Sequence, residues 1–324
     1  MENRFVKGVK RYFKDNIGII AGLLVLCTVM SILSKNFLTS NNIFNVLRQI
    51  FQNCNLALGM CLVIITGGID LSVGSNMALC GTLCCGLISL SGWDILPAIL
   101  VSCLLGAFIG ACNGFIISRT GIAPFIVTMA INQICRGSVY LYSGGQPIRT
   151  VNESYNFLGN GYVGPVPITI IYTVFFALIV WFILSRTQLG RHIYAVGGNR
   201  TAANFAGINS KNVIMIVYII IGFLAAFSGV IYCARMYSGQ PNMSTGAETD
   251  AIAAVVLGGT SFSGGVGTIG GVLIGVLVIG VLNNALNLLA VNSFWQYVAR
   301  GIVILLAVYV DTMKKNGTFS KKKA

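Results

Sequence analysis

The sequence predicts an all-α polytopic membrane protein with about ten transmembrane helices, some of them short or broken, and with both termini in the cytoplasm. Of the 324 residues, 56% are apolar and only 9% are charged, whereas a soluble domain has roughly 25% charged residues. The mean hydropathy is +0.83. Several long stretches carry no charge, and Ala251 to Ala299 is long enough for two or more passes. Because a span needs about 20 mostly apolar residues, the chain is predicted to cross a bilayer many times.

The predicted elements follow from the apolar runs and the polar breaks between them. Spans are expected near 17–35, 45–67, 73–91, 94–118, 124–143, 166–185, 212–236, 248–260, 267–290 and 294–311. They form one transmembrane domain, residues 17–312, between a basic N-terminal segment, 1–16, and a basic tail, 313–324. The Gly- and Pro-containing segment 144–165 is predicted as an outer loop. Because span 248–260 is short, nine or eleven crossings also fit the lengths.

Three clusters of basic residues set the predicted orientation. They precede the first span, follow the last span and separate the sixth span from the seventh: Arg4, Lys7, Lys10, Arg11 and Lys14; Lys314, Lys315, Lys321, Lys322 and Lys323; Arg186, Arg191, Arg200 and Lys211. Because such residues stay on the cytoplasmic side, both termini and the third cluster are predicted to be cytoplasmic, which requires an even number of spans. No small-residue cleavage site follows Ile32, so the first span is predicted to be an uncleaved helix.

Composition and motifs argue against nucleic-acid binding, metal binding and catalysis. The basic residues behind the net charge of +13 flank spans and carry no interleaved aromatic residues, which indicates contact with lipid rather than nucleic acid. The ten cysteines lie nearly all in apolar runs, where they are predicted to pack rather than bind metal or form disulfides. The only histidine is His192, and no G-x-x-x-x-G-K-[ST], H-E-x-x-H or G-x-S-x-G motif occurs. The chain is therefore predicted not to be an enzyme and to hold no cofactor.

The most informative motif is a polar break between two apolar runs, where residues 67–75 read GGIDLSVGS. Its glycines let helices stop, turn and pack closely. An acid at this depth is costly unless it has a task. Asp70 can line a pathway, pair with Arg136 or Arg300, or cap a broken helix, and a cap or ion pair is favoured over contact with a solute.

This string resembles the signature of ribose-type sugar permeases, the membrane subunits of ATP-driven bacterial importers. Two further motifs support the resemblance. Residues 186–211, RTQLGRHIYAVGGNRTAANFAGINSK, look like the coupling loop that docks on the ATP-binding subunit. Residues 248–261, ETDAIAAVVLGGTS, resemble a late-helix signature, except that Thr249 stands where the family has an apolar residue. The resemblance extends from about Phe37 to Asp311.

The resemblance implies a permease that moves a small, ribose-like sugar into the cytoplasm. It implies as partners an ATP-binding-cassette ATPase that carries the ATP and magnesium, an extracytoplasmic sugar-binding protein and a second permease copy, either identical or related, in the bacterial cytoplasmic membrane. Two alternatives stay open. One is a permease of the same superfamily for nucleosides or another small solute. The other is an ion-gradient-driven transporter that uses Asp70, Glu248 and Asp250 as coupling carboxylates.

The segment 186–211 is too polar to insert into lipid, and from composition alone it reads as a solvated loop. Asn199 is a plausible N-cap for a short helix over Thr201–Phe205 that ends at Gly207. The resemblance favours docking on the ATPase. The residues expected to matter are Gly190, Arg191, Gly197, Asn199, Ala202, Ala203, Gly207 and Ile208. We expect Ala203→Arg or Gly207→Arg to abolish coupling while the protein stays folded.

Polar residues within the spans are the candidates for the transport path. The candidates are Gly68, Asp70, Ser72 and Gly74 of the signature and the amides Asn113, Asn283 and Asn287. Other amides within the spans are Asn132, Gln133 and Asn284. Amides suit a neutral polyhydroxylated solute because they donate and accept hydrogen bonds without carrying charge. They also join helices, so both roles stay open. Glu248 and Asp250, near the outer end of their span, are predicted to cap that helix or to meet the binding protein.

A short sequence pattern occurs in two of these segments and is a weak sign of an internal repeat. The pattern Gly67-Gly68-x-x-x-Ser72-x-Gly74 recurs as Gly258-Gly259-x-x-x-Ser263-x-Gly265. Internal repeats are common in transporters, although chance is an equal explanation in a Gly-rich chain. The predicted topology makes the two copies parallel rather than inverted.

Overall fold

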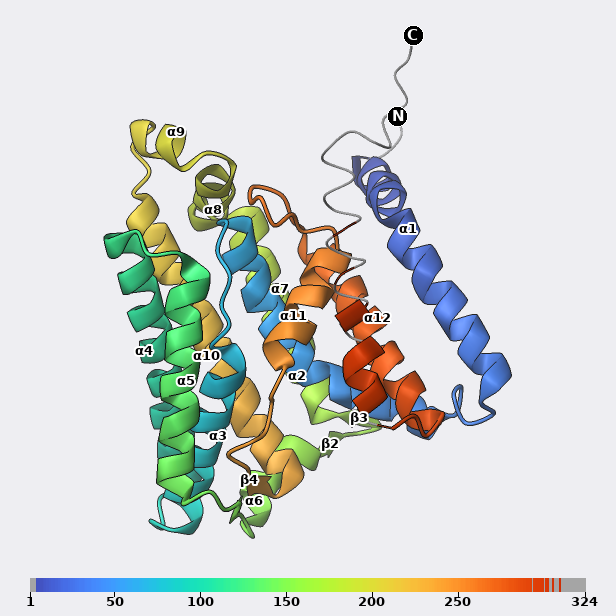
Figure 1. Ribbon diagram of the computed structural model, residues 1–324. Coiled ribbons are helices and arrows are strands. Elements are labelled where there is room, and N and C mark those ends of the chain that lie inside the picture. Colours follow the sequence, from blue (N-terminus) through green and yellow to red (C-terminus); the bar gives the residue numbers. More distant parts are fainter. Residues whose placement is uncertain (1–3, 293, 300, 303–304, 306–308, 310–324) are drawn as a thin grey trace.

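The computed structural model of the chain describes residues 4–292, 294–299, 301, 302, 305 and 309, with side chains from Gly18 onward. It is almost entirely helical (Figure 1). Within the predicted span near 294–311, residues 300, 303, 304, 306–308, 310 and 311 lie outside the described residues, and the described ones are helical. The tail 313–324 and Arg300 lie wholly outside them.

The helices are α1 (Arg4–Leu33), α2 (Ser40–Ile65), α3 (Val73–Ser89), α4 (Ile95–Thr120), α5 (Pro124–Ser143), α6 (Glu153–Asn160), α7 (Ile168–Arg186), α8 (Gln188–Gly198), α9 (Arg200–Phe205), α10 (Ser210–Met236), α11 (Ala247–Leu257) and α12 (Ile269–Leu288). The loops contain four two-residue strands, which form two antiparallel pairs. Strand β1 (Ile148–Arg149) pairs with β4 (Ser238–Gly239), and β2 (Tyr162–Val163) pairs with β3 (Val166–Pro167). Within the described residues, five helices are long and apolar enough to cross a membrane, namely α2, α4, α7, α10 and α12. The prediction of a multi-pass helical membrane protein is confirmed, while ten crossings stay a prediction.

Most predicted spans lie within a few residues of an observed helix, and the differences have local causes. Helix α1 begins at Arg4 rather than near residue 17, because the Arg and Lys residues of the N-terminal segment are good helix formers and continue the apolar helix. The predicted outer loop 144–165 contains the short helix α6, whose N-cap Asn152 accepts a hydrogen bond from the Tyr155 amide at 3.0 Å. The ten cysteines are all unpaired, and eight of them are buried.

Helix α10 lies at the centre of the bundle and touches α4 and α3 through glycines. A side chain on Gly110 of α4 would collide with the carbonyl oxygen of Tyr218. A side chain on Gly81 of α3 would lie 2.5 Å from the carbonyl oxygen of Gly229. Since lipid tails are as apolar as Leu, such small-residue contacts, rather than the hydrophobic effect, hold membrane helices together. Helices α3, α4 and α10 therefore form one block in backbone contact.

Helices α11 and α12 form a second block of the same kind. A side chain on Gly275 of α12 would meet the carbonyl oxygen of Ala254, and Gly258 lies against Gly271 in the same way. Helix α2 packs against both blocks, with Gly59 facing Ile221 of α10.

The break between α2 and α3 crosses half of the bundle without helical structure. Helix α2 ends in a turn in which Gly67 has φ of +81° and the Gly68 amide donates to the Val63 carbonyl at 3.0 Å. The chain then runs extended to the level where α3 begins, near the middle of the bundle (Figure 1). Glycine adopts such a positive φ without strain, which accounts for Gly67, whereas a side chain on Gly68 would lie 2.8 Å from the Tyr218 hydroxyl.

The same turn ends α11. Gly259 has φ of +82°, and the Thr260 amide donates to the Val255 carbonyl at 3.2 Å. Both helices end at the same side of the bundle, so the two copies are parallel, as predicted. The structural match pairs Gly67 with Gly259, one residue away from the pairing in the sequence pattern.

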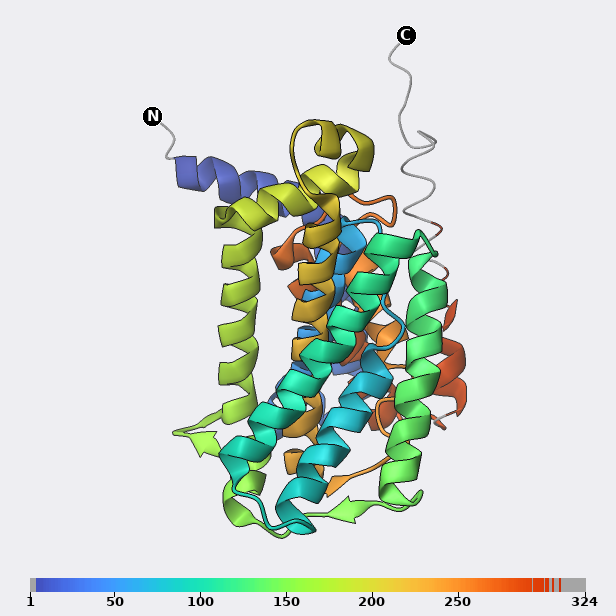
Figure 2. The ribbon, with the colours of Figure 1, turned by 90° about the vertical axis from the view of Figure 1, so that its left-hand side faces the viewer.

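The two ends of the molecule carry different elements. Helices α8 and α9 lie at one end, where α1 also begins, and α6 with the strand pairs lies at the other (Figures 1 and 2). Helix α8 lies crosswise to α7 (Figure 2). Helix α7 is the most peripheral of the five long apolar helices. In its most apolar 18-residue stretch 28% of the residues are buried, compared with 78% in α2.

Candidate coupling surface and transport path

Helix α8 follows α7 directly through a tight turn. Thr187 accepts a hydrogen bond from the Gly190 amide at 3.2 Å and so caps α8. Gly190 lies against the carbonyl groups of Ile183 and Leu184, where a side chain would collide. Sequence reasoning missed α8 because its three glycines lower helix propensity, and its stability comes from this cap and from packing.

The far half of α8 is anchored to the ends of α2 and α11. The Tyr194 hydroxyl donates to the Gly267 carbonyl at 2.7 Å. Burial raises the pKa of Tyr194 to about 12, so the hydroxyl keeps its proton and continues to donate at neutral pH. Gly197 lies against the carbonyl of Ile65, which in turn accepts from the Gly265 amide at 2.8 Å. The glycine-containing turns that follow α2 and α11 thus both contact α8 near Gly197.

Helix α9 has the predicted cap. Asn199 accepts a hydrogen bond from the Ala202 amide at 2.9 Å, and the helix ends before Gly207, whose φ is +83°. Ala203 is only 5% exposed, and its carbonyl accepts from the Ile208 amide at 3.0 Å. The structure therefore corrects the expectation for Ala203→Arg, because a buried alanine supports α9 from behind and an arginine there disturbs folding.

The side chains that α9 exposes are different ones. Arg191 of α8 is exposed, as are Thr201, Ala202 and Asn204 of α9. Phe205 is 89% exposed at the tip of the molecule, although it is a large apolar residue in a polar segment outside the spans. Sequence reasoning missed Phe205, and the available signal was a single aromatic residue among small and polar ones.

Helix α9 is tied to the start of α10. The Arg200 Nε donates to the Ser210 hydroxyl at 3.2 Å, and the Ser210 amide donates to Asn204 Oδ1 at 3.3 Å. Asn209 caps α10 by accepting from the Asn212 amide at 3.2 Å. Helix α9 and the first residue of α10 are therefore linked by two hydrogen bonds.

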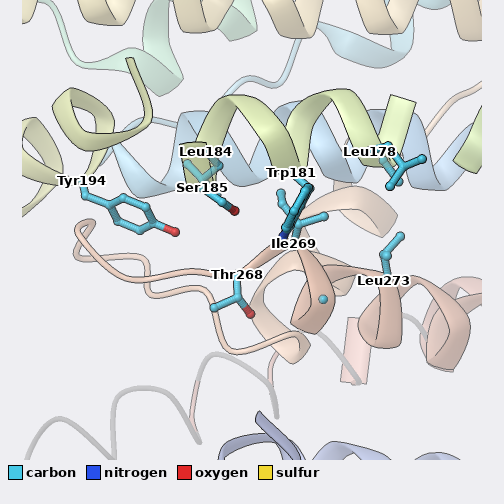
Figure 3. A pocket seen from close by; sticks show the side chains of 10 residues that line it. Leu178, Trp181, Leu184, Ser185, Tyr194, Thr268, Ile269 and Leu273 are labelled. Carbon is cyan, nitrogen blue, oxygen red and sulfur yellow. The ribbon is translucent and has the colours of Figure 1, made fainter. Parts of the chain in front are cut away.

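A cavity of about 500 Å³ lies beneath α8, between α7 and α12 (Figure 3). Trp181 of α7 lies close to Ile269 of α12 across this space, and Tyr194 closes it at the α8 end (Figure 3). The remaining lining is mostly aliphatic, including Leu178 and Leu273. Such a lining does not suit a polyhydroxylated solute.

Asp70 makes its hydrogen bonds within the break, to Ser72 just before α3 begins. Its Oδ1 accepts hydrogen bonds from the Ser72 amide at 2.8 Å and the Ser72 hydroxyl at 2.6 Å. Asn113 Nδ2 of α4 donates to the same hydroxyl at 2.8 Å. Arg136, one proposed partner of Asp70, donates instead to the carbonyl oxygens of Pro241 and Met243, at 2.7 and 3.0 Å.

The signature residues thus share one buried network. Asp70 is 1% exposed and Asn113 is fully buried, while Gly74 makes room for Ser244 and Glu248. Gly68 lies under the Tyr218 hydroxyl, which donates to the Ile69 carbonyl at 3.0 Å. The network holds the extended segment in place, and it fits the capping role better than contact with a solute.

A second cavity, of about 360 Å³, lies between α2, α10, α11 and α12. Five amides line it, Gln49, Gln52, Asn53, Asn283 and Asn287, and we call it the amide cavity. Its other polar lining residues are Tyr232, Arg235, Ser244, Thr245 and Asp250. It lies away from α8, because Gln49 is about 24 Å from the α8 end of α2 at 1.5 Å per residue. The predicted path residues Asn283 and Asn287 are brought together here.

The glutamines and asparagine of α2 and Arg235 of α10 were missed by the sequence reasoning. Their signal was present, because positions 49, 52 and 53 share one helix face. Asn284 was placed among the candidates but is used for packing, since it exchanges two hydrogen bonds with Asn42, at 3.0 and 2.9 Å.

Glu248 and Asp250 lie inside the bundle rather than at its outer face. Helix α11 begins near the middle of the bundle (Figure 1), and both acids occupy its first turn, where a carboxylate interacts favourably with the helix dipole. Asp250 is 6% exposed and lines the amide cavity. Asp250 is too buried to contact a binding protein, whereas Glu248 is half-buried, and its role as a helix cap or as a contact stays a prediction.

An apolar helix bundle with a broken helix in its middle and a polar cavity between its helices is the architecture of a membrane transport protein. Residues 42–308 match the family model described as the branched-chain amino acid transport system / permease component. The chain belongs to this family of transporter permease components.

Individual proteins of nearly equal length are more informative than the family model. The chain is 45% identical over 312 residues to the ribose import permease protein RbsC of Escherichia coli (strain K12), which covers 94% of this chain and 96% of that one. It is 47% identical over 302 residues to RbsC of Bacillus subtilis (strain 168), covering 93% and 94%. The D-allose transport system permease protein AlsC of Escherichia coli (strain K12) is 38% identical over 304 residues, 93% of each chain. All three are named as permeases, which are transport subunits rather than enzymes. No solved structure matches the chain.

Proposed function

We propose that the chain is the permease subunit of an ATP-binding-cassette importer that moves a ribose-like monosaccharide into the bacterial cytoplasm. The observation that carries the proposal is the likeness to two ribose import permeases, 45% and 47% identical over almost the whole chain. The D-allose permease is less similar, at 38%, which favours a pentose over a hexose.

In this proposal the end that carries α8 and α9 faces the cytoplasm of a cell whose inner membrane holds the protein. A separate ATPase subunit, with its ATP and magnesium, docks on the exposed side of α9 and on Phe205. An extracytoplasmic binding protein delivers the sugar at the opposite end, and a second permease copy completes the path. The basic residues Arg186, Arg191, Arg200 and Lys211 support this orientation, because basic residues are retained on the cytoplasmic side.

The energy of ATP hydrolysis would reach the sugar through α10. Its first residues are hydrogen-bonded to α9, and Tyr232, Arg235 and Met236 near its last turn line the amide cavity. At 1.5 Å per residue, a helix of this length spans about 40 Å, enough to cross the membrane. A movement of α9 therefore changes the cavity without any group that binds nucleotide in this chain.

Purification of the chain from its native cells in mild detergent tests the proposal. We expect a stoichiometric ATPase with a G-x-x-x-x-G-K-[ST] motif in the complex. We also expect ribose uptake that stops when ATP is depleted while the ion gradient is kept. Uptake that stops with an uncoupler at constant ATP, in a preparation without an ATPase, would instead establish an ion-driven transporter.

A further inference from the structure

We propose that the amide cavity binds one neutral monosaccharide within a single copy of the chain. The inference rests on the function proposed above and goes beyond it by locating the sugar and naming the side chains that hold it. The cavity volume of about 360 Å³ lies at the lower end of the range for small-ligand pockets, roughly 300–1,000 Å³.

The lining has the chemistry that a sugar requires. Every sugar hydroxyl both donates and accepts hydrogen bonds, and every amide side chain does the same. Gln49, Gln52 and Asn53 share one face of α2, and Asn283 and Asn287 share one face of α12. The two faces line the cavity together, so a bound ring meets amides from two helices.

One of these amides has an unmet hydrogen bond. Asn283 Oδ1 is buried and accepts no hydrogen bond from any residue that the structure describes. The next residue, Asn284, is fully engaged with Asn42 through two bonds. An orphaned acceptor inside an apolar bundle is costly, and a sugar hydroxyl donating to Oδ1 removes the cost.

The charges select for a neutral ligand. Arg235 and Asp250 are the charged residues of the lining, and their charges are of opposite sign. The Arg235 guanidinium is fixed on the α10 wall by donating to the Arg48 carbonyl at 3.3 Å. Because the two charges balance, they give an ion no net attraction, whereas a neutral sugar can bind to both groups, with the guanidinium as donor and the carboxylate as acceptor.

An amino-acid zwitterion is also neutral, but it needs an apolar pocket for its side chain. Here amides, hydroxyls and the two charged groups make up most of the lining, and Tyr232, Met236 and Ala247 are the exceptions with apolar surface. That surface suits the C–H face of a sugar ring, since the body of a tyrosine is apolar and its tip polar.

Cysteine protection in the assembled importer tests the site. The starting protein carries Cys27→Ser and Cys112→Ser, because these two native cysteines are partly exposed and the other eight are buried. Asn287→Cys places a thiol on the cavity wall. Ser89→Cys, at the exposed end of α3 remote from α8, is the matched control. Both are labelled in native membranes with a small cationic methanethiosulfonate, with and without ribose.

We expect ribose at about ten times its dissociation constant to slow labelling of the Asn287→Cys variant about tenfold and to leave the Ser89→Cys variant unchanged. Leucine at the same concentration should not protect. Protection by leucine and not by ribose would overturn the sugar assignment. Equal labelling with and without ribose would overturn the site, even if ATP-driven ribose uptake, and with it the proposed function, stands.

A pair of transport variants gives a second measurement. Asn283→Leu should lower ribose uptake at least tenfold per folded protein, with the folded amount measured by gel filtration in detergent. Asn55→Leu is the control, because Asn55 is a buried amide of α2 that does not line the cavity. Normal uptake by Asn283→Leu contradicts the proposal. Ribose protection without ATP-driven uptake would keep the site and reject the importer.

Discussion

The cavity beneath α8 and the amide cavity lie far apart and have opposite chemistry. The cavity beneath α8 is the larger, about 500 Å³, with Trp181 and aliphatic side chains around it, whereas the amide cavity of about 360 Å³ is lined mostly by polar groups. At the α8 end, hydrogen bonds are made by caps and backbone groups, and few side chains offer chemistry. At the amide cavity, amide, hydroxyl and charged side chains line the space, and Asn283 Oδ1 has no hydrogen-bond partner among the described residues. If the proposed function is right, we expect the α8 end to move during transport and the amide cavity to hold the solute.

The largest expected effect separates support from docking within α9. Ala203→Arg places an unpaired charge at a site that is 5% exposed, which costs about 3–5 kcal/mol, so we expect most of the folded protein to be lost in gel filtration. Ala202→Arg, on the exposed side, should fold normally and lose ATPase binding. If Ala203→Arg folds and only uncouples, α9 docks by its other face.

Phe205 tests whether the exposed tip is a contact surface. Phe205→Asp should weaken ATPase binding about 30-fold, or ~2 kcal/mol, as for an aromatic residue at the centre of an interface. It should change the free energy of unfolding by less than about 0.5 kcal/mol, because the side chain is 89% exposed. Titration of the ATPase onto the chain in nanodiscs measures the affinity. Retained affinity would move the docking surface to α8 and Arg191.

Variants of Asp70 test whether this residue supports the local structure or takes part in transport. Asp70→Asn keeps the acceptor oxygen for Ser72 and loses its charge, so we expect a loss of about 1 kcal/mol in stability and continued ribose uptake. Asp70→Ala, which removes the acceptor, should cost more. Complete loss of uptake by a folded Asp70→Asn variant would contradict the capping role and favour a coupling carboxylate.

The smallest effect is expected for Tyr194→Phe. It deletes the hydroxyl that donates to the Gly267 carbonyl and should lower the free energy of unfolding by about 1 kcal/mol. Uptake per ATP hydrolysed should fall only slightly, because Gly197 and Gly190 still anchor α8. Uptake that is fully uncoupled from ATP hydrolysis in a folded Tyr194→Phe variant would show that this single bond, rather than the glycine contacts, fixes α8.

The sequence predicted what is encoded locally. Apolar length defined α5, whose predicted limits 124–143 are those observed, and a capping residue located α9 at Asn199. Helix α8 was missed because contacts distant in sequence, such as Tyr194 with Gly267, stabilise it. The amide cavity was half predicted: Asn283 and Asn287 stood out in a long apolar run, whereas Gln49 lies in the more polar first part of the predicted span 45–67 and was not singled out.

The glycine contacts divide the helices into two blocks, and the amide cavity lies on the seam between them. Tyr232 and Arg235 belong to the block of α10, while Asp250 and Asn283 belong to the block of α11 and α12. Within each block, backbones touch and leave no layer of side chains to slide. A sugar on the seam would bridge both halves like a removable cross-link. When the two blocks separate, the hydrogen bonds of the sugar to one block would break before those to the other. Release therefore needs no single step in which all of them break together.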